Sequence, residues 1–158
     1  MAESWERDGY LISTDRSRLN IDLIHDFLSK TSYWAIGRGR DVVQRSIDNS
    51  LSFGVYKGTD QVGFARVVTD YATFAWIADV FRATGTPWSR PLQVADGRDD
   101  IALRNCRGSA AGSLATKDAH ALYERFGFIP LHRPERWMER PDPNMQESPD
   151  YWKNDPSS

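Results

Sequence analysis

The sequence is most informative at Leu114-Ala-Thr-Lys-Asp-Ala-His-Ala-Leu-Tyr-Glu-Arg-Phe-Gly-Phe-Ile-Pro130. This stretch predicts a short helix that ends on a glycine and leads directly into a strand. The hydroxyl of Thr116 can cap the start of the helix, because it can accept hydrogen bonds from the free N–H groups of the first turn. Gly127 stands where a helix needs a left-handed residue after its end. The spacing i, i+3, i+4 and i+7 gives one apolar face, made of Ala119, Leu122, Tyr123 and Phe126.

Three predicted strands lie upstream of this stretch. The segment 51–57 alternates as a strand, and a tight turn at 58–60 connects it to a partner strand over 61–70. The segment 74–81 is apolar on both faces, which is typical of a central strand. The remaining patterns predict a strand at 10–14, helices at 20–29 and 41–50, and strands at 128–133 and 136–140.

Two parts of this organisation resemble the GNAT N-acetyltransferase superfamily. The pattern Thr116-x-x-Ala119-x-x-Leu122-Tyr123-x-x-x-Gly127-Phe128 is similar to the last helix and following strand of that family. The three strands between residues 51 and 81 are similar to the sheet of a GNAT domain. The resemblance covers roughly residues 8–81 and 114–140. It implies an α/β fold with a mixed, mostly antiparallel central sheet flanked by helices.

The resemblance also implies a catalytic residue. In the family, a tyrosine at the position of Tyr123 often protonates the thiolate of coenzyme A as it leaves. Thr116 stands where the family commonly has an asparagine, so any contact made by that asparagine is in doubt here. The alternative is that Tyr123 is a core residue on the apolar face of an amphipathic helix.

The end of the third strand is the implied cofactor-binding element. By position, Asp79, Val80 and Phe81 would offer backbone groups to the pantetheine arm and the thioester carbonyl of acetyl-CoA. Backbone N–H groups suit this task, because an oxyanion must be stabilised where its charge develops. The carboxylate of Asp79 has two further interpretations, a general base acting through a water or a structural group at the strand end. The structural interpretation is favoured, because a base must also reach the amine.

A loop with two rings and two glycines follows the first predicted helix, over residues 32–40. In GNAT proteins the loop at this place commonly forms one wall of the acceptor cleft. Tyr33 and Trp34 are therefore the candidate substrate-binding residues, and simple packing against the neighbouring helix is the alternative. The run Gly37-Arg-Gly-Arg40 is only weakly similar to a phosphate-binding loop, because it follows no strand and lacks the remaining glycine and lysine.

The segment 82–113 breaks the family pattern. After Phe81 the family has approximately V-x-P-x-x-R-G-x-G, whose glycine-rich turn holds the pyrophosphate of coenzyme A at a helix N-terminus. This motif is absent, and the segment is rich in Gly, Pro, Ser, Arg and Asp. Two explanations stay open. The segment is either a genuine, diverged insert or an out-of-frame translation, since its permitted codons, read one base later, can encode the missing motif.

Length and composition limit the classes of function. The chain has 158 residues, a net charge of −2 and one cysteine, Cys106, so we expect one domain without an internal disulfide in a reducing cytoplasm. There is no apolar run of about 18 residues that would predict a membrane span. Nothing in the charge pattern indicates a nucleic-acid-binding surface. We expect a single GNAT-like domain over 1–140 and a polar, proline-rich tail over 141–158.

The activity implied by the resemblance is acetyl transfer from acetyl-CoA to an amine. A small-molecule amine is the expected acceptor, because nothing in the sequence marks a peptide-binding groove. No metal site is predicted. The alternative function is that of a catalytically impaired GNAT-like shell, which acts as a binding or dimerisation module, and a homodimer is compatible with either function.

Overall fold

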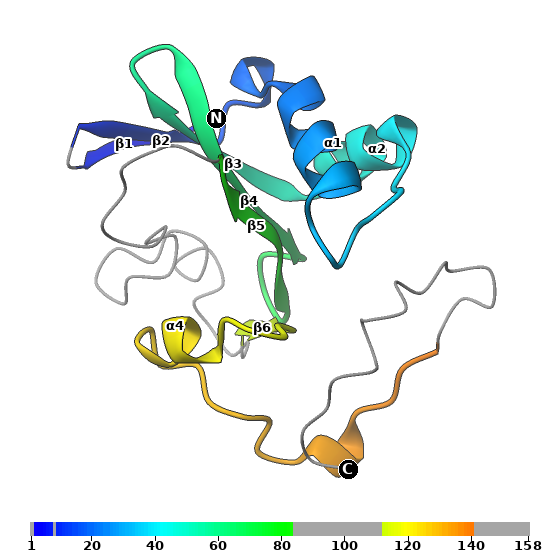
Figure 1. Ribbon diagram of the computed structural model, residues 1–158. Coiled ribbons are helices and arrows are strands. Elements are labelled where there is room, and N and C mark those ends of the chain that lie inside the picture. The colour runs from blue at the N-terminus through cyan, green and yellow to red at the C-terminus, as the bar shows by residue number, and fades with distance from the viewer. Residues whose placement is uncertain (1, 8, 84–111, 141–158) are drawn as a thin grey trace.

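A six-stranded sheet is the central element of the computed structural model, which describes residues 2–7, 9–83 and 112–140 (Figure 1). The strands lie in the order β1-β2-β3-β4-β5-β6. Neighbours from β1 to β5 are antiparallel, and β5 and β6 are parallel. The sheet therefore has the mixed, mostly antiparallel character that the sequence predicts. The strands are β1 (Ser4–Arg7), β2 (Tyr10–Ser13), β3 (Leu51–Lys57), β4 (Asp60–Thr69), β5 (Ala75–Arg82) and β6 (Gly112–Leu114).

Two helices, α1 (Ile21–Lys30) and α2 (Arg40–Asp48), lie on one face of the sheet (Figure 1). The side chain of Asn20 caps α1, because its carbonyl oxygen accepts a hydrogen bond from the N–H of Leu23 at 3.0 Å. Each helix buries one side against β4 and β5, as amphipathic helices do. The buried residues of this cluster are Leu19, Ile24, Leu28, Ala35, Val43, Ile47, Phe64 and Phe81.

The opposite face of the sheet carries a second apolar cluster. Side chains alternate along β4, so Phe64 belongs to the helix-covered cluster and Ala65 to the second one. Leu114 and Phe128, which lie on either side of α4 (His120–Glu124), pack against this second cluster. Its buried members are Tyr10, Ile12, Phe53, Val55, Val62, Ala65, Val67, Ala75 and Ile77.

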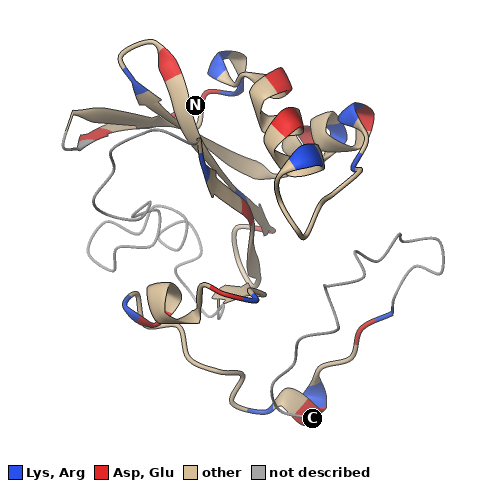
Figure 2. Ribbon diagram, viewed as in Figure 1, with Lys and Arg blue, Asp and Glu red and all other residues tan. Residues whose placement is uncertain are grey.

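Charged residues of both signs are interspersed along α1 and α2 (Figure 2). Three ion pairs form there, and all six side chains are more than half exposed. Exposed pairs of this kind contribute little to stability, because water screens them. The pairs are Arg40–Asp22 at 2.8 Å, Lys30–Asp26 at 2.9 Å and Arg45–Asp41 at 3.4 Å.

The elements predicted for the first half of the chain are confirmed, with small shifts of their ends. β3 has the predicted bounds, and β4 and β5 are each displaced by one residue. The turn between β3 and β4 is tight, with Lys57 paired to Asp60 and a left-handed Gly58 at φ 62°. β1 was not predicted, because its polar sequence Ser-Trp-Glu-Arg carries little apolar alternation.

The predicted helix near Leu114 is shorter than expected. The hydroxyl of Thr116 accepts the N–H of Ala119 at 3.0 Å, so it closes a turn ahead of the helix rather than the first turn of the helix. Gly127 has the predicted left-handed conformation, with φ 86°. The N–H of Phe128 then returns to the carbonyl of Tyr123 at 3.2 Å, a common way to satisfy the end of a helix.

The two strands predicted at 128–133 and 136–140 are wrong. No strand follows β6 in the described part of the chain, and Pro134–Arg136 forms a single 3-10 turn, η3. Pro130 and Pro134 lack the N–H that a strand ladder needs, and residues 129–140 are exposed. β6 was not predicted either, because three residues, Gly-Ser-Leu, carry no periodicity.

Two predicted segments lie mainly outside the described residues. They are the atypical segment 82–113, of which the structure describes Arg82, Ala83, Gly112 and Ser113, and the tail 141–158. The single-domain assignment and both explanations of the atypical segment therefore stay predictions. Among the residues that are described, no helix is long and apolar enough to cross a membrane.

Candidate active site

A β-bulge interrupts β5 close to its end. The ladder between β4 and β5 places two β5 residues, Asp79 and Val80, opposite the single β4 residue Ala65. Asp79 has φ 52°, a left-handed conformation that residues other than glycine seldom adopt. Bulges re-aim side chains and are common next to functional sites. The strand end that the sequence assigns to cofactor binding is therefore irregular in the structure.

The same part of β5 loses a neighbouring strand. Its parallel pairing with β6 ends at the pair Ile77 and Leu114, whereas its pairing with β4 continues to Arg82. One edge of β5 is thus without a β6 partner over residues 78–81, within the part of the chain that the structure describes. An open sheet edge can hydrogen-bond an extended ligand through its backbone groups.

The side chains of Val80 and Phe81 pack on opposite faces of the sheet. Phe81 is 5% exposed, and its ring stacks on that of Phe27 with 4.1 Å between the ring centroids. Val80 is partly buried and packs against the second apolar cluster on the opposite face. The cofactor-binding role that the resemblance assigns to the backbone of these residues stays a prediction.

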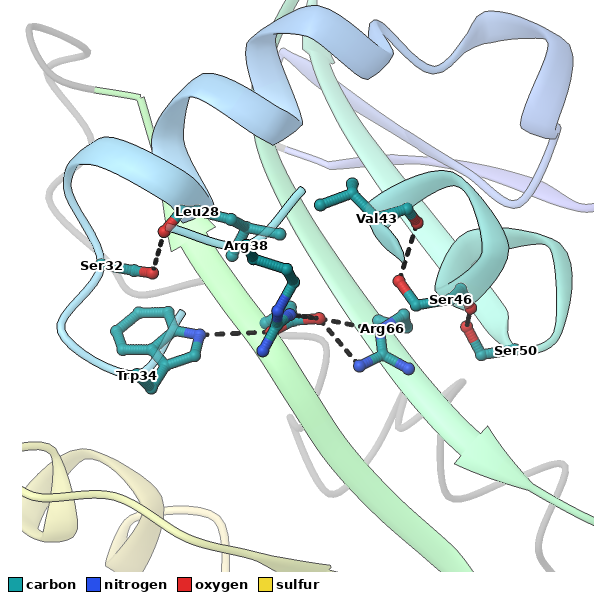
Figure 3. A network of polar contacts seen from close by, with 9 residues as sticks. Leu28, Ser32, Trp34, Arg38, Val43, Ser46, Ser50 and Arg66 are labelled. Carbon is teal, nitrogen blue, oxygen red and sulfur yellow. Dashed lines mark hydrogen bonds and ion pairs between the residues drawn. The ribbon is translucent and has the colours of Figure 1, made fainter. Parts of the chain in front are cut away.

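The carboxylate of Asp79 is buried among three donor side chains (Figure 3). Arg66 of β4 donates to Oδ2 through Nε at 2.9 Å and approaches it through Nη2 at 2.8 Å. Arg38, from the loop between α1 and α2, donates through Nη1 to both oxygens, at 3.0 and 3.1 Å. Trp34 donates its indole N–H to Oδ1 at 3.2 Å. The Asp79 side chain is only 3% exposed.

These contacts bear on the two interpretations of the Asp79 carboxylate. A carboxylate has about four acceptor positions, and both oxygens of Asp79 already accept from cationic guanidinium groups. A general base needs a free lone pair that is directed at the proton it abstracts, whereas the oxygens of Asp79 are directed at the donors of Arg38, Arg66 and Trp34. The geometry therefore favours the structural interpretation of Asp79, the one that the sequence also favours.

Tyr33 and Trp34 connect this cluster to the segment before α4. Their rings meet edge to face, with 4.9 Å between centroids. The hydroxyl of Tyr33 accepts the backbone N–H of Lys117 at 2.9 Å and lies 3.5 Å from Oδ1 of Asp118. Trp34 also packs against the helix-covered cluster, so the predicted alternative, packing, holds for part of its ring.

Tyr123 lies on α4 in partly buried surroundings. Its ring meets that of Phe128 edge to face, with 5.7 Å between centroids. Burial raises the pKa of the Tyr123 phenol above its ordinary value of 10.0, and the nearby Tyr33 and Asp118 raise this pKa further. The phenol therefore keeps its proton at neutral pH, which a general acid requires.

The structure brings the loop of Tyr33 and Trp34 into contact with two other parts of the predicted site. Trp34 binds Asp79 of β5, and Tyr33 binds Lys117 and Asp118 ahead of α4, the helix that carries Tyr123. Sequence reasoning missed Arg38, Arg66 and Asp118. A signal for Arg66 was present, because a charged residue within a predicted strand that is otherwise mostly apolar needs a buried partner.

A separate groove of about 620 Å³ lies next to β6 and is lined by Gly112, Ser113 and residues between 126 and 137. Neither Tyr123 nor Asp79 lines it. Within the described ranges, no group of three His, Cys, Asp or Glu side chains is placed to hold a metal ion.

The mixed sheet with helices on one face defines an α/β class of structure, and comparison with known proteins narrows this class. A solved structure from Xanthomonas campestris pv. campestris, assigned to the acetyltransferases of the GNAT family, is 39% identical to this chain with a TM-score of 0.75. The superposition covers 90% of this chain and 99% of that one. The chain therefore belongs to the GNAT family of acetyltransferases.

Two further comparisons agree with this membership. A curated protein of Gibberella zeae, assigned as the acetyltransferase FG08082, is 32% identical over 98 residues, covering 50% of this chain and 55% of that protein. The chain thus spans about half the length of this curated relative. A GNAT family acetyltransferase from Streptococcus pneumoniae has a TM-score of 0.54 at 18% identity, covers 92% and 98% of the two chains, and supports the fold alone. No family model matches the chain.

Proposed function

We propose that this chain transfers the acetyl group of acetyl-CoA to the amine of a small molecule, with Tyr123 as the general acid. In this proposal the backbone of Asp79, Val80 and Phe81 binds the thioester arm, and Tyr33 and Trp34 line the acceptor side. The acceptor amine attacks the thioester carbonyl, the carbon–sulfur bond breaks, and the leaving sulfur takes the phenolic proton of Tyr123. The products are the N-acetylated amine and coenzyme A. The proton lost by the amine passes to solvent, and the phenolate of Tyr123 regains a proton from solvent.

One observation carries the proposal. Three parts of the chain that are far apart in sequence meet at the loop after α1, where Trp34 binds Asp79 of β5 and Tyr33 binds Lys117 and Asp118 just ahead of α4. These are the parts to which the resemblance assigns acid, acceptor wall and cofactor strand.

The described residues fit one part of acetyl-CoA, the pantetheine arm. This arm contains two amide groups, which can pair with backbone N–H and C=O groups as a strand does. The β5 edge without a β6 partner offers such groups over residues 78–81, and the bulge at Asp79 changes their direction there. The segment in which the family holds the pyrophosphate lies outside the described residues.

The first test is calorimetric titration of the 158-residue chain with acetyl-CoA, paired with an assay for free thiol release in the presence of a panel of primary amines. Binding near the micromolar range and amine-dependent thiol release support the proposal. A folded sample that gives no heat at several temperatures, and no thiol release, would contradict it. That result would instead favour the impaired shell that binds or dimerises without catalysis.

A further inference from the structure

We propose that the acceptor carries a carboxylate in addition to its amine, and that Arg38 binds this carboxylate. The proposal rests on the acetyltransferase function proposed above and names the chemical class of its acceptor. It begins from the hydrogen bonds of one arginine in the loop between α1 and α2.

The guanidinium of Arg38 has an unused donor edge. Its bonds to Asp79 all come from Nη1. Nε and Nη2 make no hydrogen bond or ion pair with any residue in the described ranges. These two nitrogens form the side of the guanidinium fork that matches a carboxylate with two parallel bonds. Arg66 uses the same two nitrogens on Asp79, so the edge that is occupied in Arg66 is open in Arg38.

The charges of the cluster are not balanced. Two guanidinium groups, those of Arg38 and Arg66, share the single carboxylate of Asp79, which leaves a net charge of about +1 among side chains that are 25%, 13% and 3% exposed. A charge removed from water is costly unless a partner compensates it. One more monoanion would neutralise the cluster. A carboxylate provides one negative charge, whereas a phosphate group near neutral pH carries closer to two.

The position of Arg38 matches the acceptor side of the proposed site. Arg38 and Trp34 bind the same oxygen of Asp79, and the backbone of Asp79 belongs to the proposed thioester strand. A carboxylate held by Arg38 would therefore leave the rest of a small acceptor near that strand end. The arginines on the outer surface of α2 differ, because Arg40 and Arg45 are exposed and paired with Asp22 and Asp41.

The decisive experiment measures binding without catalysis. N-acetylated amino acids, the expected products, are compared with their primary amides by saturation-transfer NMR titration, in wild type, Arg38→Gln and Arg40→Gln. Each acid and its amide have nearly the same size and shape, and the amide lacks the negative charge and has an NH2 donor in place of one acceptor oxygen. We expect wild type to bind the acids about tenfold or more tightly than the amides, as charge-assisted bonds imply. We expect Arg38→Gln to abolish this ratio and Arg40→Gln to keep it.

A kinetic experiment uses the same comparison. The ratio of kcat/KM for β-alanine and γ-aminobutyrate to kcat/KM for their amides should fall about tenfold in Arg38→Gln and remain unchanged in Arg40→Gln. The ratio cancels any general loss caused by the altered partner of Asp79, and Arg38→Lys, which keeps the charge without the fork, should give an intermediate value.

The outcomes separate this proposal from the function on which it rests. Three results would overturn the proposal. Wild type could bind acids and amides equally, the preference for acids could survive in Arg38→Gln, or the folded protein could bind no acid at all. Inorganic phosphate and acetate are compared as competitors of the acids. If phosphate displaces the acids more effectively than acetate, the carboxylate assignment is overturned. Absence of thiol release with every amine, while acids still bind through Arg38, contradicts the enzyme function and supports the carboxylate site.

Discussion

Arg66 and Asp79 form a two-pronged ion pair across the strands β4 and β5, with Nε and Nη2 of the arginine 2.9 and 2.8 Å from the same carboxylate oxygen. The pair lies at the bulge, where Asp79 adopts its left-handed conformation. A side chain held in this way fixes the backbone from which it projects. The same ion pair therefore stabilises the sheet and fixes the backbone conformation of the proposed thioester-binding strand.

Asp79→Asn should be strongly destabilising. Asparagine tolerates the left-handed backbone conformation, so the substitution tests the charge rather than the strain. Two partly buried guanidinium groups would lose the buried carboxylate that compensates them, and removal of one partner from a buried ion pair costs roughly 3–5 kcal/mol. Urea denaturation measures this loss. Asp22→Asn is the matched control, since its pair with Arg40 is exposed and should change stability by about 0.5 kcal/mol or less. Equal midpoints for the two variants would contradict the role of the cluster.

The fold could be predicted where a local pattern carries the information. Alternation over 51–57 and the helical spacing in 20–29 each describe an element that buries one face, so the sequence itself records the burial. β6 carries no such record, because its three residues gain a place in the sheet only through pairing with β5. The strands expected after Gly127 show the opposite case. Their sequence has an extended, partly apolar pattern, but such a pattern does not provide a neighbouring strand to pair with.

The site could be predicted in its parts but not in its connections. Tyr123, Tyr33 and Asp79 follow from motif and position, and Trp34 joins the last two, because it touches the ring of Tyr33 and binds Asp79. The bond from Arg38 to Asp79 spans 41 positions in the sequence and depends on how one loop lies over the sheet. No periodicity encodes such a contact. The contact between Arg38 and Asp79 becomes predictable only from the rule that a buried charged group needs a partner.

Tyr56→Phe should stabilise the protein. The Tyr56 side chain is 2% exposed, and within the described structure its hydroxyl has no hydrogen-bond partner. A buried polar group without a partner is unfavourable, so its removal should raise the free energy of unfolding by about 1 kcal/mol. Gly54→Ala is the contrasting variant, because a methyl group there would collide with the ring and hydroxyl of Tyr56. A Tyr56→Phe variant less stable than wild type at pH 7 would contradict this account.

The same residue gives a prediction for alkaline pH. Burial raises the pKa of Tyr56 above its ordinary 10.0, against the opposing effect of Arg18. The unfolded chain ionises this phenol first, so its ionisation leaves the free energy of unfolding unchanged below pH 10 and lowers it as the pH rises from there through the folded pKa. Wild type should therefore lose stability above pH 10 more steeply than Tyr56→Phe. Parallel curves for the two proteins in urea unfolding would refute the effect.

Asp70 should contribute stability that disappears in acid. Its carboxylate accepts the hydroxyl and N–H of Thr73 and the N–H groups of Ala72 and Phe74, and these bonds hold its pKa well below the ordinary 3.8. The stabilisation is present above pH 3.8 and is lost as the pH falls toward the folded pKa. Asp70→Asn should thus melt at a lower temperature than wild type at pH 7, and the gap should narrow below pH 3.8. A gap independent of pH would exclude this cause.

Tyr123→Phe should remove most of the acetyl transfer and leave the fold intact. Loss of a general acid lowers the rate by roughly a hundredfold or more, so kcat should fall while the KM for acetyl-CoA changes little. Because burial, Tyr33 and Asp118 raise the pKa of the Tyr123 phenol, wild-type kcat should stay level through neutral pH and decline only above the ordinary 10.0. Tyr33→Phe should move that decline to lower pH. The exposed Tyr71 supplies the control, and Tyr71→Phe should have wild-type kinetics. An unchanged kcat in Tyr123→Phe would mean that Tyr123 is a core residue without a catalytic role. The thiolate would then take its proton from water.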